Sequence, residues 1–197
     1  NFIDEKEFVK IAELGIRFII DEAYIEYAGL KKSLSRLIKK FKNVIVTRTM
    51  SKAYGLAGLR FGYLLADKEV AMKIAATLLP WNVGTIIMWA ALTALVDQKG
   101  LAKRVKFNNE QAAFIEKEMS KISGMVVFPT RANYVLFDAG ATGKKSTDVL
   151  AYAQKKGIIL RGEKAKHGSD GWFRVTIGLK EENKLFIKVM KEFFERK

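Results

Sequence analysis

The chain has 197 residues, of which 49% are hydrophobic and two are proline, a composition that excludes an intrinsically disordered protein. It has no cysteine and one histidine, which excludes disulfides and thiolate metal sites, argues against a transition metal and favours the reducing cytoplasm. The formal net charge of +14 is spread along expected helices without a nucleic-acid-binding motif, and no apolar run reaches the roughly 18 residues that span a bilayer. We therefore expect neither a nucleic-acid nor a membrane partner.

The first hundred residues alternate short apolar runs with helical spacing of apolar residues. The expected strands cover residues 16–24, 43–48 and 60–66, and the expected helices cover 5–14, 30–41, 67–78 and 83–98. Strands that are hydrophobic on both faces belong inside a parallel sheet covered by helices. The third strand should run antiparallel because its connection is short. We expect the apolar helix 83–98 to be buried.

The second half of the chain has a different order of expected strands and helices. The expected strands cover 125–128, 131–137, 158–161 and 172–177, and the expected helices cover 101–123, 146–156 (capped by Ser146) and 181–196. This order predicts a compact α+β lobe. We therefore expect an α/β protein with a mostly parallel sheet in residues 1–99 and a small α+β domain in residues 100–197.

The loop from Thr47 to Tyr63 gathers polar and flexible residues between two apolar runs, as binding loops do. It contains one lysine, Lys52, and a lysine amine reacts with aldehydes once it is unprotonated. Desolvation or neighbouring cations keep such an amine unprotonated, and Arg48 and Arg60 are near Lys52 in the sequence. We interpret Lys52 as a candidate Schiff-base lysine.

A cofactor with a phosphate and a pyridinium ring would find its remaining partners close to Lys52 in the sequence. Hydroxyls, glycine N–H groups and a guanidinium bind phosphate, and Thr49, Ser51 and Arg60 supply the side chains. A protonated ring nitrogen needs an anion, which Asp21 offers at the end of the preceding strand. Tyr24 could donate a hydrogen bond to an oxygen of the same ring. The carboxyl ends of parallel strands share one edge of a sheet, so we expect these side chains to gather there.

Three motifs of the chain resemble the fold-type I pyridoxal-phosphate aminotransferases, and within them most of all the histidinol-phosphate aminotransferases. The motifs run from Asp21 to Tyr24, from Thr47 to Tyr63 and from Trp172 to Gly178, in the order of that family. The run Ser-Lys-Ala-Tyr-Gly-Leu-Ala-Gly-Leu-Arg around Lys52 is the most specific of them. The resemblance covers nearly the whole chain and implies a large pyridoxal-phosphate-binding domain, represented in part, followed by the small domain.

The resemblance also implies a role for each matching residue toward the cofactor, pyridoxal 5'-phosphate. Lys52 would bind the cofactor covalently and move the proton between Cα and the cofactor. Asp21 would pair with the ring nitrogen, and Tyr24 would donate to the phenolic oxygen. The residues that would bind the phosphate are Thr49, Ser51 and Arg60.

For the substrate, the resemblance implies that Arg174 binds the α-carboxylate and that Arg161 faces a phosphate group. Asn133, in an Ala-Asn-Tyr motif, would lie near the substrate. The implied activity is amino transfer between histidinol phosphate and 2-oxoglutarate in histidine biosynthesis, by a cytoplasmic homodimer that uses amino acid and 2-oxo acid substrates. A related aromatic aminotransferase, a threonine-phosphate decarboxylase-like enzyme and a non-catalytic fragment that keeps the fold stay open as alternatives.

The chain also departs from the family pattern. It does not begin with Met, and it lacks the family's glycine turn over the cofactor phosphate, the aromatic residue that stacks on the ring, and an asparagine that contacts the phenolic oxygen. We therefore expect part of a longer protein, with little transaminase activity on its own. Glu22 and Glu26, beside the Asp21 motif, could help to position the site, but we interpret them by default as surface acids. We interpret His167 as a loop histidine, and Trp81 and Trp89 as core or dimer contacts.

Overall fold

A computed structural model describes residues 4–163 and 170–195. The chain forms two compact units, residues 1–105 and 106–197, whose boundary falls inside helix α5 (Gln98–Met119). No helix in the described ranges combines the length and the apolar composition that a membrane span requires.

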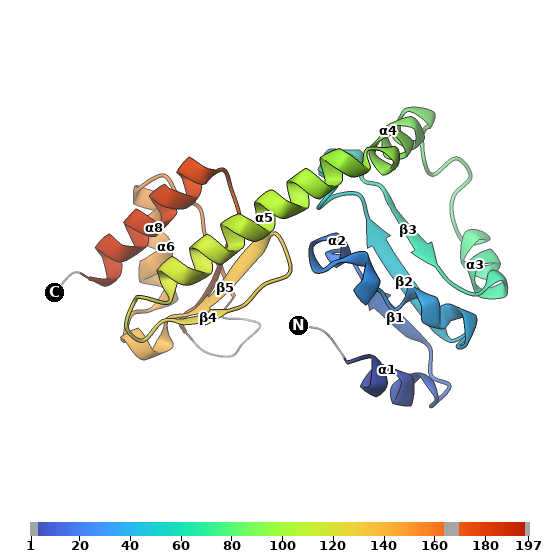
Figure 1. Ribbon diagram of the computed structural model, residues 1–197, viewed down its shortest axis with the longest axis horizontal. Coiled ribbons are helices and arrows are strands. Elements are labelled where there is room, and N and C mark those ends of the chain that lie inside the picture. Colours follow the sequence, from blue (N-terminus) through green and yellow to red (C-terminus); the bar gives the residue numbers. More distant parts are fainter. Residues whose placement is uncertain (1–3, 164–169, 196–197) are drawn as a thin grey trace. The chain divides into compact units, whose positions relative to one another are not determined.

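The first unit is built on a three-stranded sheet in the order β1-β2-β3 (Figure 1). Its strands are β1 (Phe18–Asp21), β2 (Val44–Thr49) and β3 (Gly62–Leu65). Its helices are α1 (Glu5–Ala12), α2 (Ile25–Ala28), α3 (Lys68–Ala75) and α4 (Thr85–Val96), with a short 3₁₀ turn η3 (Ala57–Leu59) before β3. The first two strands are parallel and β3 runs antiparallel to β2, as its short connection predicts.

The parallel pairing brings the ends of β1 and β2 to one edge of the sheet. Asp21, the last residue of β1, pairs in register with Thr47. On the far side of β2, Thr49 pairs with Gly62. A side chain at Gly62 would place its Cβ 2.8 Å from the Arg48 carbonyl oxygen, so the close approach of the two strands requires glycine there.

Two buried clusters support this sheet. Under α1 the cluster consists of Phe8, Ala12, Leu37, Val44 and Val46. Beyond the end of β2 a second cluster contains Tyr27, Met50, Ala53, Tyr54, Ala91 and Leu101. The first cluster holds the strands, and the second holds the loop that follows them.

Two expectations for the first unit are wrong. The stretch 30–41 is not one helix but two 3₁₀ segments, η1 (Leu30–Lys32) and η2 (Ser35–Lys39). The break falls where the Ser33 hydroxyl and the Leu34 N–H donate to the Glu22 carboxylate, at 2.8 and 2.7 Å. These hydrogen bonds replace the helical ones because serine side chains compete with the backbone.

The expected burial of the apolar helix is also wrong. In α4 only Ala91 is buried, while Ile86, Trp89 and Val96 are exposed, and Trp81 before the helix is exposed as well. The sheet has an open apolar side too, since Ile19 of the edge strand β1 is 71% exposed. The first unit therefore presents apolar surface that its own residues do not cover.

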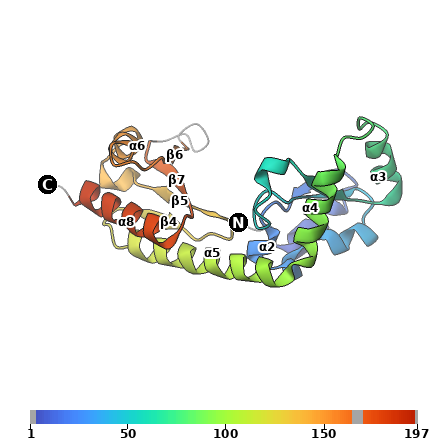
Figure 2. The same ribbon diagram turned by 90° about the horizontal axis from the view of Figure 1, so that it is seen from above.

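The second unit has a four-stranded antiparallel sheet in the order β4-β5-β7-β6, which Figure 2 shows from above. The strands are β4 (Val126–Phe128), β5 (Tyr134–Asp138), β6 (Arg161–Gly162) and β7 (Trp172–Thr176). The turn η4 (Gly140–Thr142) and the helices α6 (Ser146–Lys155) and α8 (Lys180–Phe194) complete it. The element order matches the expectation, although Lys145 rather than Ser146 occupies the cap position of α6.

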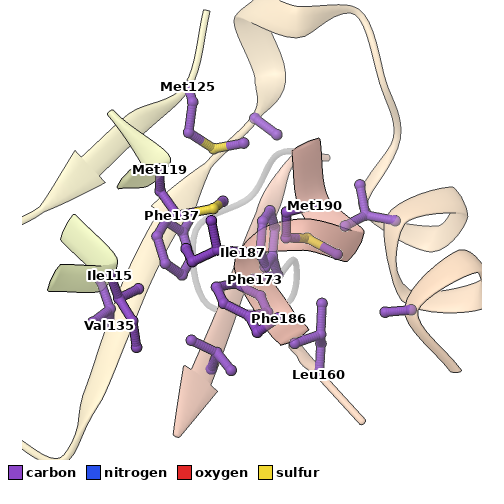
Figure 3. Close-up of a cluster of buried hydrophobic side chains, with 14 of the residues drawn as sticks. Ile115, Met119, Met125, Val135, Phe137, Leu160, Phe173, Phe186, Ile187 and Met190 are labelled. Carbon is purple, nitrogen blue, oxygen red and sulfur yellow. The ribbon is translucent and has the colours of Figure 1, made fainter. Parts of the chain in front are cut away.

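The core of the second unit lies on one face of this sheet (Figure 3). Val135, Phe137, Phe173 and Val175 alternate along β5 and β7 and belong to the core cluster together with residues of α5, α6 and α8. Residues between them point to the other face, because successive side chains of a strand alternate. Arg174 is therefore on the face opposite the core.

Candidate functional site

The loop after β2 is held in place by buried residues on both sides of Lys52. Met50 is fully buried, Ala53 and Tyr54 are buried, and the Arg104 Nε donates to the Ala53 carbonyl oxygen at 3.0 Å. Lys52, between Met50 and Ala53, is only half-buried. The sequence Met-Ser-Lys-Ala-Tyr thus fixes the backbone with its apolar members and leaves the lysine amine accessible.

Two expected phosphate ligands lie together at the start of this loop. The Thr49 hydroxyl donates to the Ser51 hydroxyl at 2.9 Å, and the Ser51 N–H donates to Thr49 Oγ1 at 3.1 Å. The Met50 N–H donates to the Phe61 carbonyl oxygen at 3.1 Å, which ties this turn to the residue after Arg60. The result is a pair of hydroxyls and a backbone turn at one strand end.

Lys52 also meets the loop that follows β1. Its Nζ lies 5.4 Å from the centroid of the Tyr24 ring, within the range of a cation–π contact. Asp21, at the end of the same strand, is exposed and accepts a hydrogen bond from the Ala23 N–H at 2.9 Å. The structure therefore brings Lys52 and Tyr24 together, while Asp21 turns its carboxylate toward its own loop.

Arg60 has an unusual backbone. Its φ of 53° lies in the left-handed region, which residues other than glycine rarely adopt. Its side chain is exposed, and Nη1 donates to the Ala57 carbonyl oxygen at 2.8 Å. The guanidinium thus contacts the η3 turn, and the described contacts do not join it to the Thr49 and Ser51 hydroxyls. Backbone strain of this kind concentrates at functional sites.

The sequence interpretation missed a buried ion pair next to this loop. Glu22 accepts from Arg48 Nε at 3.0 Å and from its Nη2 at 2.9 Å, besides its bonds to Ser33 and Leu34. Both side chains are nearly buried, so the expectation of a surface acid at Glu22 is wrong. The register of Asp21 with Thr47 places the next residues, Glu22 and Arg48, side by side, and the sequence alone does not fix that register.

Burial disfavours the charge of Arg48, but hydrogen bonds to Tyr63 and Glu22 outweigh burial and raise the pKa of its guanidinium above the ordinary value. Glu26 is buried as well, so it is not a surface acid either. Burial raises the pKa of its carboxyl, and within the described residues its Oε2 has no hydrogen-bond partner. Burial and the neighbouring Glu26 raise the pKa of Tyr27 to about 12.

In the second unit, the two expected substrate arginines face each other across neighbouring strands. Arg161 of β6 pairs in register with Arg174 of β7. Glu163 Oε1 lies 3.2 Å from Arg161 Nε and 3.1 Å from Arg174 Nε, and the Arg174 guanidinium carbon lies 4.7 Å from the centroid of the Tyr134 ring.

Glu163 was not among the expected site residues, because its contact with both arginines depends on the pairing of β6 with β7. Asn133, just before β5, is half-buried and accepts at its carbonyl oxygen from the Ile177 N–H at 2.9 Å. His167 lies outside the described residues.

This strand-end lysine loop and the paired arginines occur on a chain whose residues 2–188 match the family model of aminotransferase class I and II. The chain belongs to that family. Among curated proteins it is 35% identical to the histidinol-phosphate aminotransferase of Pyrococcus furiosus over 195 residues, which is 99% of this chain and 53% of that protein.

Two solved structures are similar to this chain in their three-dimensional fold. The histidinol-phosphate aminotransferase of Clostridium acetobutylicum has a TM-score of 0.91 and 26% identity, covering 98% of this chain and 60% of that one. The enzyme of Sinorhizobium meliloti, in complex with pyridoxal-5'-phosphate, has a TM-score of 0.79 and 26% identity, covering 91% and 49%. The chain spans about half the length of the curated relatives it matches. The expected α/β class and partial fold-type I architecture are confirmed.

Proposed function

We propose that this chain is part of a pyridoxal-phosphate-dependent aminotransferase that moves an amino group between histidinol phosphate and 2-oxoglutarate in histidine biosynthesis. The observation that carries the proposal is the contact of Lys52 with Tyr24, which joins an anchored amine to an aromatic hydroxyl residue from the neighbouring strand end. The identity to histidinol-phosphate aminotransferases over nearly the whole chain supports the choice of substrate. We further propose a cytoplasmic homodimer, with residues 1–99 in the cofactor domain and 100–197 in the small domain.

The side chains near Lys52 fit pyridoxal phosphate. A primary amine on a fixed loop suits the aldehyde, and the adjoining hydroxyls of Thr49 and Ser51 suit the phosphate. Arg60 follows on the same loop and adds a guanidinium. Asp21 supplies a carboxylate at the neighbouring strand end. This set contains a nucleophile, an anion and phosphate donors, and the cofactor needs each of them.

When bound, the cofactor supplies a ring that accepts the electron pair left behind when the substrate Cα loses its proton. Lys52 would hold the aldehyde carbon covalently until the substrate amine replaces it there, and the Nζ freed by that exchange would then carry the proton at Cα. Asp21 would keep the proton on the ring nitrogen, and Tyr24 would donate to the phenolic oxygen. Thr49, Ser51 and Arg60 would bind the phosphate.

The second unit would recognise the substrate. Arginine offers a planar fork that matches carboxylate and phosphate. Arg174 would bind the α-carboxylate of the amino acid or 2-oxo acid, and Arg161 would bind the phosphate of histidinol phosphate. Asn133 would lie near the substrate. Histidinol phosphate carries a phosphate group that purely aromatic substrates lack, so a phosphate-binding arginine would distinguish the two.

The experiment for the cofactor uses the full-length protein reconstituted with pyridoxal phosphate. We expect a near-visible absorption band that persists in Lys68→Ala, a variant of an exposed lysine of α3, and disappears in Lys52→Ala. A protein that binds no pyridoxal phosphate, or a band that survives in Lys52→Ala, would overturn the assignment of the lysine.

The experiment for the substrate compares amino transfer to 2-oxoglutarate from histidinol phosphate and from phenylalanine, and tests threonine phosphate for decarboxylation. We expect the highest kcat/KM with histidinol phosphate. Faster transfer from phenylalanine, or carbon dioxide release from threonine phosphate, would replace the proposed activity by that of a related enzyme.

A further inference from the structure

Glu163 occupies an unusual place between the two arginines of the second unit. Its side chain is only 4% exposed, and its carboxylate lies within 3.2 Å of the Nε atoms of both Arg161 and Arg174. Its backbone N–H donates to the Trp172 carbonyl oxygen at 2.9 Å, which continues the pairing of β6 with β7. The backbone therefore fixes the carboxylate at the strand edge where the arginines face each other.

A carboxylate at this point has a clear electrostatic effect. Two guanidinium groups on paired positions of neighbouring strands repel each other, and like charges directly opposite destabilise a sheet. Glu163 offsets one of the two charges and contacts both groups. A buried carboxylate in turn requires such partners, because an unpaired buried charge is costly. The three side chains therefore depend on one another.

The contacts with Glu163 involve the Nε atom of each arginine rather than a terminal nitrogen. Both guanidinium groups approach Glu163 through Nε. Arginine has five N–H donors, and the four on the two terminal nitrogens form the fork that grips carboxylate or phosphate. Glu163 can thus orient Arg161 and Arg174 through Nε without using the terminal nitrogens of either guanidinium group.

The two arginines differ in how much they rely on Glu163. Arg174 is 26% exposed, and its guanidinium also stacks over the Tyr134 ring at 4.7 Å. The Arg161 side chain is 61% exposed, and Arg161 is the first residue of the two-residue strand β6. Loss of the Glu163 charge should release Arg161 into solvent, since repulsion from Arg174 would then be unopposed, while Tyr134 continues to hold Arg174.

We propose that Glu163 is a positioning residue that determines phosphate specificity by holding Arg161 beside Arg174. The proposal rests on the proposed function, in which Arg161 binds the substrate phosphate. Glu163 acts through Arg161 and does not touch the substrate. Its removal should therefore reproduce the loss of Arg161, and it should have little further effect once Arg161 is gone.

The test measures dissociation constants of histidinol phosphate and of histidinol, its analogue without phosphate, by calorimetry on the full-length protein. In Glu163→Gln we expect histidinol phosphate to bind about 10-fold or more weakly, the size of one charge-assisted hydrogen bond. We expect histidinol to change by no more than about twofold. In the Arg161→Ala background, Glu163→Gln should change neither constant by more than about twofold.

Glu181→Gln is the matched control, because Glu181 is an exposed carboxylate of α8 that pairs with Lys184 at 3.1 Å. It should leave both constants unchanged. Equal weakening of histidinol phosphate and histidinol in Glu163→Gln would indicate a merely structural role and overturn the proposal. Tighter binding of histidinol phosphate would overturn it too, since Glu163 would then be competing with the substrate anion.

A second readout separates this proposal from the proposed function. If wild-type protein binds neither compound, the substrate assignment fails, and the arginines are probed with inorganic phosphate by ¹⁵N NMR of the Arg Nε–H groups. We expect phosphate to shift the Arg161 signal in the wild type and not in Glu163→Gln. The role of Glu163 would be overturned if phosphate does not shift the Arg161 signal in the wild type, or if it shifts that signal equally in the wild type and in Glu163→Gln.

Discussion

Single charged residues around the Lys52 loop differ in how far they are free to bind a ligand. Arg48 is close to Lys52 in sequence, but its guanidinium is paired with Glu22 at 2.9 Å in a nearly buried position. It therefore cannot serve as an unpaired cation beside the lysine amine. Arg60 is exposed and contacts only a backbone carbonyl oxygen in the described structure, so it is the better candidate for an anionic ligand.

Removal of one charged partner of the Glu22–Arg48 pair should lower the free energy of unfolding strongly. Glu22→Gln leaves Arg48 with a neutral partner in a nearly buried place, and we expect a loss of roughly 3–5 kcal/mol in the free energy of unfolding. The double variant Glu22→Leu with Arg48→Met should recover much of it, because no unpaired charge remains buried. Urea unfolding of the full-length protein measures both.

The matched control for Glu22 is Glu7→Gln, which removes an exposed carboxylate that pairs with Lys10 on α1 at 2.9 Å. We expect a change of about 0.5 kcal/mol or less, as for other surface pairs. A similar small change in Glu22→Gln would contradict the idea that this buried pair fixes the two strand ends.

Arg60 allows backbone strain to be separated from ligand binding. Arg60→Gly relieves a left-handed backbone, worth about 1–2 kcal/mol, but adds chain entropy to the unfolded state, so stability should change by about 1 kcal/mol or less. Affinity for pyridoxal phosphate should fall about 10- to 100-fold, because a charge-assisted contact to the phosphate is lost. Equilibrium titration with the cofactor and urea unfolding provide the two numbers.

Trp81 supplies the control for Arg60, because it is the other non-glycine residue with positive φ among the described residues, at 59°. It is 95% exposed and precedes α4. Trp81→Gly should have a similar effect on the backbone and leave cofactor affinity unchanged. Equal affinities in wild type and Arg60→Gly would show that Arg60 does not bind the phosphate.

At the scale of elements, the sequence predicts best where local signals and packing agree. Asp4 caps α1 by accepting from the Lys6 N–H at 2.8 Å, and Asp67 caps α3 in the same way through Glu69, at 3.1 Å. The first helix was expected from the spacing of its apolar residues, and the second from Asp67 as its cap. The prediction of one helix over residues 30–41 was wrong because Ser33 and Leu34 donate hydrogen bonds to Glu22, which lies 11 and 12 residues earlier in the chain. Local spacing of apolar residues does not encode such a contact.

Residues of the candidate site divide in the same way into those with a local signal and those whose partners come from distant strands. The strand-end residues Asp21, Tyr24 and Lys52 follow from local pattern, because parallel strands end at one edge. The partners of Glu22 and Glu163 depend on strand register, which one sequence does not fix. Burial of α4 was overestimated because composition reports how apolar a helix is and not what covers it.

An ion-pair group between α5 and α8 should give the second unit a pH-dependent stability. Hydrogen bonds from Lys121 and Lys191 lower the pKa of Glu118 from 4.5 to about 2. Because the folded pKa lies below the unfolded one, the stabilisation is fully present above about pH 4.5 and is lost as pH falls toward 2. We expect the difference in melting temperature between wild type and Glu118→Gln to be constant from pH 7 to pH 5 and to shrink from pH 4.5 to pH 3.

Thermal unfolding at half-unit pH steps measures this difference. Glu181→Gln, which removes an exposed partner of Lys184 on α8, should give a small difference that stays nearly constant over the same range. A wild-type advantage over Glu118→Gln that is unchanged at pH 3 would mean that Glu118 does not titrate with a lowered pKa.

At the scale of the whole molecule, the two units differ in how completely they bury their apolar residues. The core of the second unit is drawn entirely from residues 115–190, and its largest members, Phe137 and Phe173, are fully buried (Figure 3). In the first unit, Ile19, Ile86 and Trp89 are exposed. Large apolar residues that stay exposed in this way are candidates for contacts with other protein. Folding should therefore be self-sufficient in the second unit and dependent on further contacts in the first.

A shortened protein of residues 106–197 should consequently fold by itself. We expect a cooperative urea transition followed by circular dichroism. We also expect a loss of roughly 3–5 kcal/mol in Phe137→Ala, because the substitution leaves a cavity beside the rings of Phe173 and Phe186. Val126→Ala on β4, where the side chain is 49% exposed, should cost about 1 kcal/mol or less. The counterpart of residues 1–105 should show a broad transition and bind a hydrophobic dye, since its apolar surface stays open. A broad transition in 106–197, or a loss in Phe137→Ala no larger than in Val126→Ala, would show that the core of the second unit needs the first to form.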